Sequence, residues 1–301
     1  MSHFDEILNQ GKTKEEDKVQ QTEAKDKPAW MQKREALFEM IEDVCPTIVT
    51  STQEMTEFLT VLSRFEKYSL KNNILIYAQR ADATKIKDYQ GWKDEGGFVK
   101  KGSKSFMILE PSPYTKDGEP RVSFHAKTVF DASDVTGITS PPQTSYDKAM
   151  LIRALVNDSP VDIKTVKDYP ADQPEGAYYH VKDHCIYAKA GMEVCDIFLS
   201  VSQALACAEM ERVSDEPFRV ANHMFQARCV AFVLATKYGV PTDKVSLYSM
   251  PNRYATYNCE QIQKELSEIH GAVKVISGRM NQILQERLPA TNKSRSDKEE
   301  R

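Results

Sequence analysis

The sequence predicts an α+β protein of two domains, in which helices and a small antiparallel sheet precede a β-hairpin and further helices. Its 301 residues, 41% of them hydrophobic, exceed the roughly 100–200 residues of one typical domain and can build more than one core. Helical spacing and short alternating segments occur in both halves. Residues 137–144 (GITSPPQT) are the best linker candidate, because glycine, proline and serine favour turns. We therefore expect domains at 30–142 and 143–288.

Both ends of the chain are polar and charged. Residues 1–29 contain seven acidic side chains and five lysines, and 289–301 (PATNKSRSDKEER) are of the same kind. Such segments bury too little apolar surface to offset the entropy lost on ordering, so we expect disorder at both ends. The chain shows neither a secretory leader nor a run of about 18 apolar residues, which predicts a cytoplasmic protein without a membrane partner. Its six cysteines are accordingly expected to be reduced.

The first half opens with three helices, expected over 30–44, 52–67 and 69–79. Thr52 and Ser69 are candidate N-caps, because a hydroxyl can accept a hydrogen bond from the first helical turn. Two strand pairs follow. Residues 98–111 (FVKKGSKSFMILEP) alternate and predict a hairpin that turns at Lys101-Gly102, and 121–132 (RVSFHAKTVFDA) predict a second pair.

The second half alternates short strands with longer helices. A helix is expected over 145–157, followed by a strand over 161–166 and a hairpin over 178–188 that turns at Lys182-Asp183. Three more helices are expected over 193–212, 216–238 and 258–287. The last helix carries a stripe of apolar residues, which most often packs on the domain: Ile262, Leu266, Ile269, Val273, Ile276, Met280, Ile283 and Leu284.

The net charge of −4, taken over the whole chain, argues against nucleic-acid binding. Residues 67–104, however, carry nine basic against four acidic side chains, a local charge of +5 that leaves −9 elsewhere. Aromatic residues are interleaved with these cations, at Tyr68, Tyr77, Tyr89, Trp92, Phe98 and Phe106. Cations attract phosphates and flat rings stack unpaired bases, so the segment is typical of a single-stranded nucleic-acid interface. The alternative is an ordinary charged surface over an aromatic core.

Several residues of this segment follow a family pattern in order: Tyr68-Ser69, Asn72-Asn73, Gln79, Ala83-Thr84, Trp92, Gly97, Val99, Lys101-Gly102 and Pro111, with 127–137 (KTVFDASDVTG) as the closing strand. Over roughly 33–140 the chain resembles the N-terminal domain of ArdC-type antirestriction proteins. The resemblance implies single-stranded DNA as the partner, in a protein of plasmids and other conjugative elements. Conjugation or restriction proteins are possible further partners.

The predicted DNA-binding residues are Lys67, Tyr68, Lys71, Asn72, Asn73, Gln79, Lys85, Trp92, Lys100, Lys101 and Lys104. The lysines of the turn at 100–104 are expected to neutralise the DNA backbone, and the turn itself can offer backbone N–H groups to a phosphate. Asn72 and Asn73 lie near a predicted helix start, where they can cap the helix or contact a phosphate. Trp92 either stacks a base or anchors the core, and we favour the anchor.

Residues 178–240 resemble the zinc-metallopeptidase (zincin-like) domain that ArdC-type proteins commonly carry, in which one helix bears HExxH and a second bears acidic ligands. That motif places two imidazoles and a general base on one helix face. The corresponding positions here hold Gln203, Ala204 and Cys207, and the acidic positions hold Gln226 and Arg228. Glutamine is a poor zinc ligand, alanine cannot move a proton, arginine opposes a cation, and one cysteine cannot rebuild the site. We therefore expect a degenerate domain with no catalytic residues, metal or cofactor.

The predicted function is that of a non-catalytic single-stranded-DNA-binding protein of a mobile element, which serves antirestriction or DNA transfer. Two alternatives stay open. One is a zinc peptidase with an unorthodox site, for which His180, His184 and His223 could supply ligands. The other is a scaffold whose two domains both bind protein.

Overall fold

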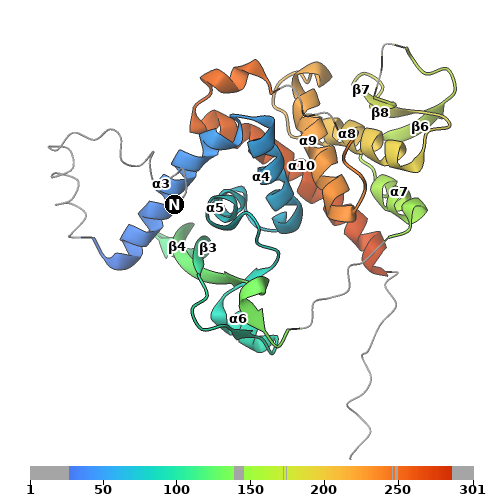
Figure 1. Ribbon diagram of the computed structural model, residues 1–301. Helices are drawn as coiled ribbons and strands as arrows, with labels where there is room; N and C mark the ends of the chain where they lie inside the picture. The colour runs from blue at the N-terminus through green and yellow to red at the C-terminus, as the bar shows by residue number, and fades with distance from the viewer. Residues whose placement is uncertain are drawn as a thin grey trace, which may run out of the picture.

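The computed structural model describes residues 27–138, 146–171, 173, 175–245, 247 and 250–286. Helices alternate there with three small sheets, which confirms the predicted α+β class (Figure 1). Of the predicted tails, only residues 27–29 are described, and most of the predicted linker also lies outside the described residues. The division at 142 stays a prediction. None of the described helices is both long enough and apolar enough to span a membrane.

Three helices open this part of the chain: α3 (Ala29–Ile48), α4 (Thr52–Phe65) and α5 (Leu70–Arg80). Ser69 caps α5 as predicted, and its hydroxyl accepts a hydrogen bond from a first-turn N–H. The cap of α4 is Ser51 and not the predicted Thr52. Thr52 already belongs to the helix, and its hydroxyl donates 3.1 Å away to the carbonyl of Leu247 in the second half of the chain.

The main sheet of the first half is one long antiparallel hairpin of β3 (Phe106–Lys116) and β4 (Glu119–Asp131). It turns at Asp117 and Gly118, whose φ angles of 55° and 80° suit a tight hairpin turn. The strand β1 (Ile86–Lys87) pairs with the other edge of β4.

The predicted hairpin over 98–111 is wrong. Its first part, β2 (Phe98–Val99), pairs with β5 (Val135–Thr136), and its second part belongs to β3. Residues 121–132, expected to form a strand pair, contribute to the single strand β4. The reason is length: β3 finds in β4 a partner for all 11 of its residues, whereas a turn at Lys101-Gly102 would have left a two-residue β2 to hold it.

A short helix that was not predicted, α6 (Tyr89–Asp94), lies between β1 and β2. Asp88 caps it, and its carboxylate accepts a hydrogen bond from the Gly91 N–H at 2.7 Å. We call β1, α6, β2, the connection 100–104 and β5 the α6 lobe. Figure 1 shows this lobe at one end of the molecule, away from β6–β8.

The second half follows the predicted order. It comprises α7 (Lys148–Val156), β6 (Asp162–Val166), β7 (Ala177–His180), β8 (Cys185–Lys189), α8 (Val194–Arg212), α9 (Val220–Tyr238), a 3-10 turn (Asn252–Thr256) and α10 (Cys259–Glu286). The hairpin of β7 and β8 is confirmed, and β6 adds to β8 in parallel. Every residue of α8 from Phe198 to Met210 is buried, so this helix is the centre of the second half. The apolar stripe of α10 packs inward as expected.

One hydrophobic cluster joins the two predicted domains. It contains buried residues of α3, α4 and α5 together with those of α7–α10. At the α4–α9 contact, the buried Glu66 forms an ion pair with Lys237, and the ring of His270 lies 2.8 Å from the Glu66 carbonyl oxygen. A substitution in the core on either side of residue 142 therefore affects the packing of a core that both halves share.

Candidate nucleic-acid interface

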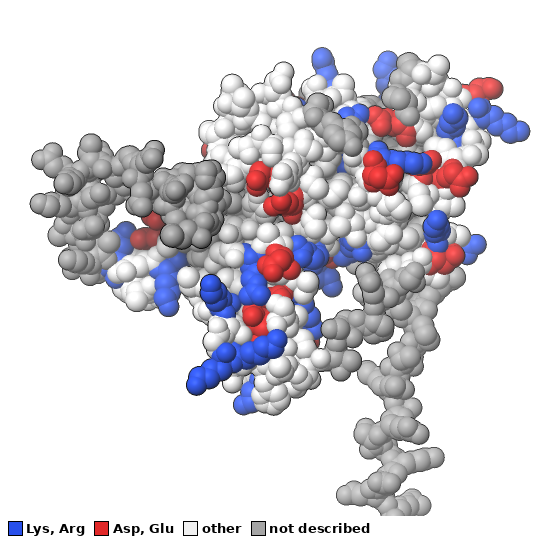
Figure 2. Space-filling model, in the orientation of Figure 1, with Lys and Arg blue, Asp and Glu red and all other residues white. Residues whose placement is uncertain are grey.

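The connection between β2 and β3, residues 100–104, is the most exposed basic feature of the α6 lobe; we call it the lysine turn. Lys100, Lys101 and Lys104 are all exposed. Among the described residues, none of these three forms an ion pair with a carboxylate. Figure 2 shows basic groups gathered on the lobe at the bottom of the molecule. The lysine turn therefore offers positive charge that no carboxylate of the described residues offsets.

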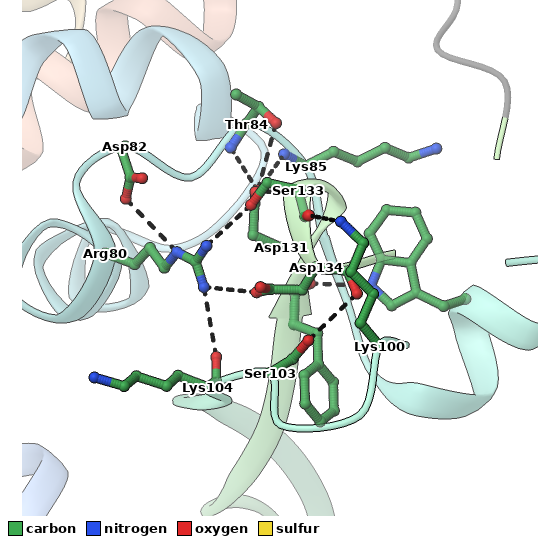
Figure 3. A network of polar contacts seen from close by, with 12 residues as sticks. Arg80, Asp82, Thr84, Lys85, Lys100, Ser103, Lys104, Asp131, Ser133 and Asp134 are labelled. Carbon is green, nitrogen blue, oxygen red and sulfur yellow. Dashed lines mark hydrogen bonds and ion pairs between the residues drawn. The ribbon is translucent and has the colours of Figure 1, made fainter. Parts of the chain in front are cut away.

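Arg80, the last residue of α5, holds the lysine turn in place (Figure 3). Its guanidinium pairs with Asp134 at 2.6 Å and donates to the Ser133 hydroxyl at 2.9 Å. The same group reaches the Lys104 carbonyl oxygen at 3.5 Å and Asp82 at 3.6 Å. A planar guanidinium can make such contacts in several directions at once, so the turn is linked to a rigid helix end.

The 3-10 turn Ala132–Asp134 anchors the other side of the lysine turn. Lys100 donates from its backbone N–H to the Asp134 carbonyl at 2.9 Å and from its ammonium to the Ser133 carbonyl at 2.8 Å. The buried Asp131 accepts backbone N–H bonds from Thr84 at 2.7 Å and Ser133 at 2.9 Å. Burial opposes ionisation of this carboxyl, but these hydrogen bonds outweigh it and lower its pKa. The residues that support the lysine turn therefore include a buried carboxylate, Asp131, that stays ionised at neutral pH.

The other predicted lysines differ in the groups that their ammonium groups contact. Lys85 forms an ion pair with Glu95 at 2.8 Å, and its ammonium lies 5.4 Å from the centre of the Trp92 ring. Lys71 lies 5.0 Å from the centre of the Phe38 ring, outside the lobe. Lys67 and Lys71 form no ion pair with any described residue, but they sit at the start of α5, at the opposite end from Arg80. The basic residues behind the local charge of +5 therefore lie in two places, the α6 lobe and the start of α5.

The predicted polar residues of α5 are bonded within the protein. Asn72 clamps the strand β3, donating to the Leu109 carbonyl at 2.8 Å and accepting from the Leu109 N–H at 2.8 Å. Gln79 repeats this arrangement with Met107, at 2.8 and 3.0 Å. The buried Asn73 donates to the Ser69 carbonyl at 3.0 Å. The amides of Asn72 and Gln79 thus bond the backbone of β3 as a neighbouring strand would, and they join α5 to β3.

Trp92 and Tyr68 also face inward. Trp92 has 0% of its surface exposed, and its indole N–H donates to the Phe130 carbonyl at 3.0 Å, which agrees with the core-anchor interpretation. The hydroxyl of Tyr68 lies 3.3 Å from the Ile86 carbonyl oxygen that it donates to, and burial raises its pKa. The Trp92 ring therefore offers no open face to a base, and Tyr68 is partly buried.

Two other aromatic rings of the lobe are exposed. Phe98 in β2 is 65% exposed and Tyr89 at the start of α6 is 60% exposed. Phe98 directly precedes Val99 and the lysine turn. Both belong to the interleaved aromatic residues of the sequence, but neither is among the predicted DNA-binding residues. The sequence does not show that Phe98 is exposed, because the β2–β5 pairing decides which face of Phe98 is covered.

The second set of predicted positions lies around a pocket of about 730 Å³ between α8 and α9, the α8–α9 pocket. Gln203 and Arg228 line it, and Arg228 pairs with Glu175 at 2.6 Å. Gln226 points to α10 instead and donates to Glu265 at 3.0 Å. Ala204 and Cys207 are buried in the core, and burial raises the pKa of the Cys207 thiol to about 12.

These residues do not fit a zinc ion. The pocket brings together an amide and a guanidinium, and the buried thiol stays protonated. The three histidines considered as substitutes have separate partners: His180 pairs with Asp183, His184 with Glu211, and His223 lies 3.1 Å from the Arg219 carbonyl oxygen. In the part of the chain that the structure describes, no three His, Cys, Asp or Glu residues are grouped as a metal site requires.

Known proteins match both the segment and the fold. Residues 32–132 match the model of the N-terminal domain of anti-restriction factor ArdC. This match covers about one third of the chain. The lysine turn, α5 and the clamp residues Asn72 and Gln79 lie inside the matched range. No curated protein matches the chain.

Two solved structures of the antirestriction protein ArdC from plasmid R388 share the fold beyond this domain. The metal-free structure is 17% identical, and the match covers 80% of this chain and 98% of that chain with a TM-score of 0.50. The Mn(II)-bound structure is 14% identical, with 85% and 99% covered and a TM-score of 0.50. At these identities the likeness concerns the fold alone. The Mn(II) belongs to that protein.

Proposed function

We propose that this ArdC-type protein binds single-stranded DNA with its α6 lobe and acts without catalysis, as an antirestriction or DNA-transfer factor of a mobile element. The antirestriction role is taken from the name of the matched family and of ArdC from plasmid R388. Conjugation or restriction proteins are the further partners that such a role would require.

One observation carries the proposal: exposed lysines that pair with no described carboxylate follow an exposed aromatic ring within six residues of the chain, on a turn that Arg80 holds. Lys101 and Lys104 are free to neutralise phosphates, and Phe98 has a face for a base. Duplex DNA hides its bases, so the ring favours a single strand. Lys67, Lys71 and Lys85 are secondary candidates, whereas Tyr68, Asn72, Asn73, Gln79 and Trp92 support the lobe from inside.

The absence of catalysis is proposed from the α8–α9 pocket. Ala204 has no group that can move a proton, and the guanidinium of Arg228 is a fixed cation that does not act as a base at neutral pH. A protein that coats or escorts DNA does not need a reactive group, only contacts that tolerate any sequence.

The test is a fluorescence-anisotropy titration of the full chain with a labelled 20-mer of single-stranded DNA and with its duplex, at several salt concentrations. The double variant Lys101→Ala/Lys104→Ala is expected to bind the single strand about tenfold more weakly and to lower the salt slope by about 1.4, the value for two lost phosphate contacts. Phe98→Ala should also weaken binding about tenfold without changing the salt slope, because stacking releases no counterions.

The matched control is Lys164→Ala/Lys182→Ala, which removes two exposed lysines from the β6–β8 region. It carries the same net charge as the test variant and should bind like the unaltered protein. Equal affinities of all variants, or a preference for the duplex, would contradict the proposed function.

A further inference from the structure

The α8–α9 pocket lies apart from the α6 lobe and has a charge pattern of its own. Its walls carry three cations, Lys189, Arg228 and Lys244, and two carboxylates, Glu175 and Asp196. Arg228 is paired with Glu175 and Lys244 with Asp196, each at 2.6 Å. Lys189 is exposed and forms no ion pair with a described residue. The net charge of the pocket is therefore +1, which a singly charged anion would neutralise.

Gln203 is the clearest sign that a ligand completes this pocket. Only 8% of its surface is exposed, and its amide makes no hydrogen bond to any residue that the structure describes. The amide nitrogen and oxygen are not among the fully buried atoms that lack a partner, so they are open to the pocket and available to a ligand. Because Gln203 lines the pocket, its partner would come from within the pocket.

Arg228 has donors left for the same ligand. Its contact to Glu175 uses one of the two terminal nitrogens, and a guanidinium has five N–H donors. Planar forks of this kind match the geometry of a carboxylate. Gln203 on α8 and Arg228 on α9 both line the pocket, so the two helices together provide an amide and a guanidinium donor.

The rest of the wall suits an apolar body. Leu199, Ala231 and Val245 line the pocket beside these polar groups. Gly176 lies in this wall with a φ of 78°, and a Cβ there would lie 2.6 Å from the sulfur of Met192, so a larger residue would be strained and would have to displace the Met192 side chain. A ligand with one anionic end and one apolar end therefore fits better than a free inorganic ion.

We propose that the α8–α9 pocket binds a carboxylate that carries an apolar side chain, with Arg228 and Gln203 holding the carboxylate and Leu199, Ala231 and Val245 contacting the side chain. Such a group occurs in small carboxylic acids and at the C-terminus of a peptide. In this chain Arg228 supplies hydrogen-bond donors to the pocket, and Lys189 supplies its net positive charge.

The test is a ligand-observed NMR titration of the full chain with N-acetyl-L-leucine and with its neutral analogue N-acetyl-L-leucinamide. We expect the acid to bind at least tenfold more tightly than the amide. Arg228→Gln and Gln203→Leu should each weaken binding of the acid at least tenfold, while far-UV circular dichroism reports an unchanged fold. The matched control Arg219→Gln removes an exposed arginine at the start of α9, outside the pocket, and should leave binding unchanged.

A second arm separates the two sources of the ligand by comparing N-acetyl-Ala-Ala-Leu with N-acetyl-L-leucine. Tenfold tighter binding of the peptide supports a peptide C-terminus, and equal binding supports a small acid. Equal binding of acid and amide, an unchanged affinity in Arg228→Gln, or tighter binding of inorganic phosphate would overturn the proposal. None of these results depends on DNA binding, because the variants lie outside the α6 lobe.

Discussion

The lysine turn and the α8–α9 pocket both collect positive charge, but they arrange it in opposite ways. On the turn, Lys101 and Lys104 are exposed, and the nearby Asp134 is occupied by Arg80. In the pocket, two of three cations are held by carboxylates on the walls. Exposed charge without a partner suits a polyanion of any sequence, whereas paired charge in a concave site suits one ligand of defined shape.

The largest effect is expected from removing the anchor of the α6 lobe. Trp92→Ala leaves a large cavity in a fully buried site and breaks the hydrogen bond to Phe130, so it should lower the free energy of unfolding by about 3–5 kcal/mol. Urea denaturation measures this loss. The exposed Phe98 provides the control, since Phe98→Ala should change stability by less than about 0.5 kcal/mol. If both variants were equally stable, the lobe would not depend on Trp92.

A smaller effect, but a sharper comparison, comes from the two arginines. Arg80→Gln should release the lysine turn and weaken single-stranded DNA binding about tenfold, because three contacts to the turn and its support are lost. Arg228→Gln removes the same charge from the pocket and should leave DNA binding unchanged. Anisotropy titrations of both variants decide the matter. Equal losses would mean that only net charge counts, and not the geometry of the turn.

The smallest effect concerns the core that joins the two halves. Burial is the main cause that lowers the pKa of His270 below its usual value, so the folded protein holds this ring neutral while the unfolded chain protonates near pH 6.5. Stability is therefore complete above that pH and is lost as the pH falls through it, by at most about 1.4 kcal/mol per pH unit. His270→Gln should flatten the pH dependence between pH 7 and 5 in urea denaturation. An unchanged slope would assign it to other groups.

Much of the fold follows from local patterns. Helices α5 and α7–α10 begin and end close to the predicted residues, and the β7–β8 hairpin turns where expected. These elements were predictable because apolar spacing and capping hydroxyls act within a few residues. The pairing of β2 was not predictable, because it depends on which distant segments pair with one another. Strand β3 pairs with the long strand β4, and β2 pairs with β5.

The candidate site likewise has features that the sequence predicts and features that it does not. The charge of the lysine turn was visible in the sequence, and so were the residues at the positions predicted for a metallopeptidase signature, Gln203, Ala204, Cys207, Gln226 and Arg228. The roles of Asn72 and Gln79 were not visible. In the sequence, an amide on a helix looks alike whether it contacts a phosphate or, as here, clamps the backbone of β3.

The sequence by itself determined the order of the longer helices, the buried face of α10 and the local charge of +5 inside a chain of net charge −4. Those properties depend on composition and on neighbours along the chain. Only the tertiary structure decided that Lys85 is paired while Lys101 and Lys104 pair with no described carboxylate, and that Phe98 is exposed while Trp92 is buried. It also decided that Gln203 and Arg228 line one pocket while Gln226 turns to α10. Pairing and burial depend on what packs from distant parts of the chain, and that information is absent from any short segment.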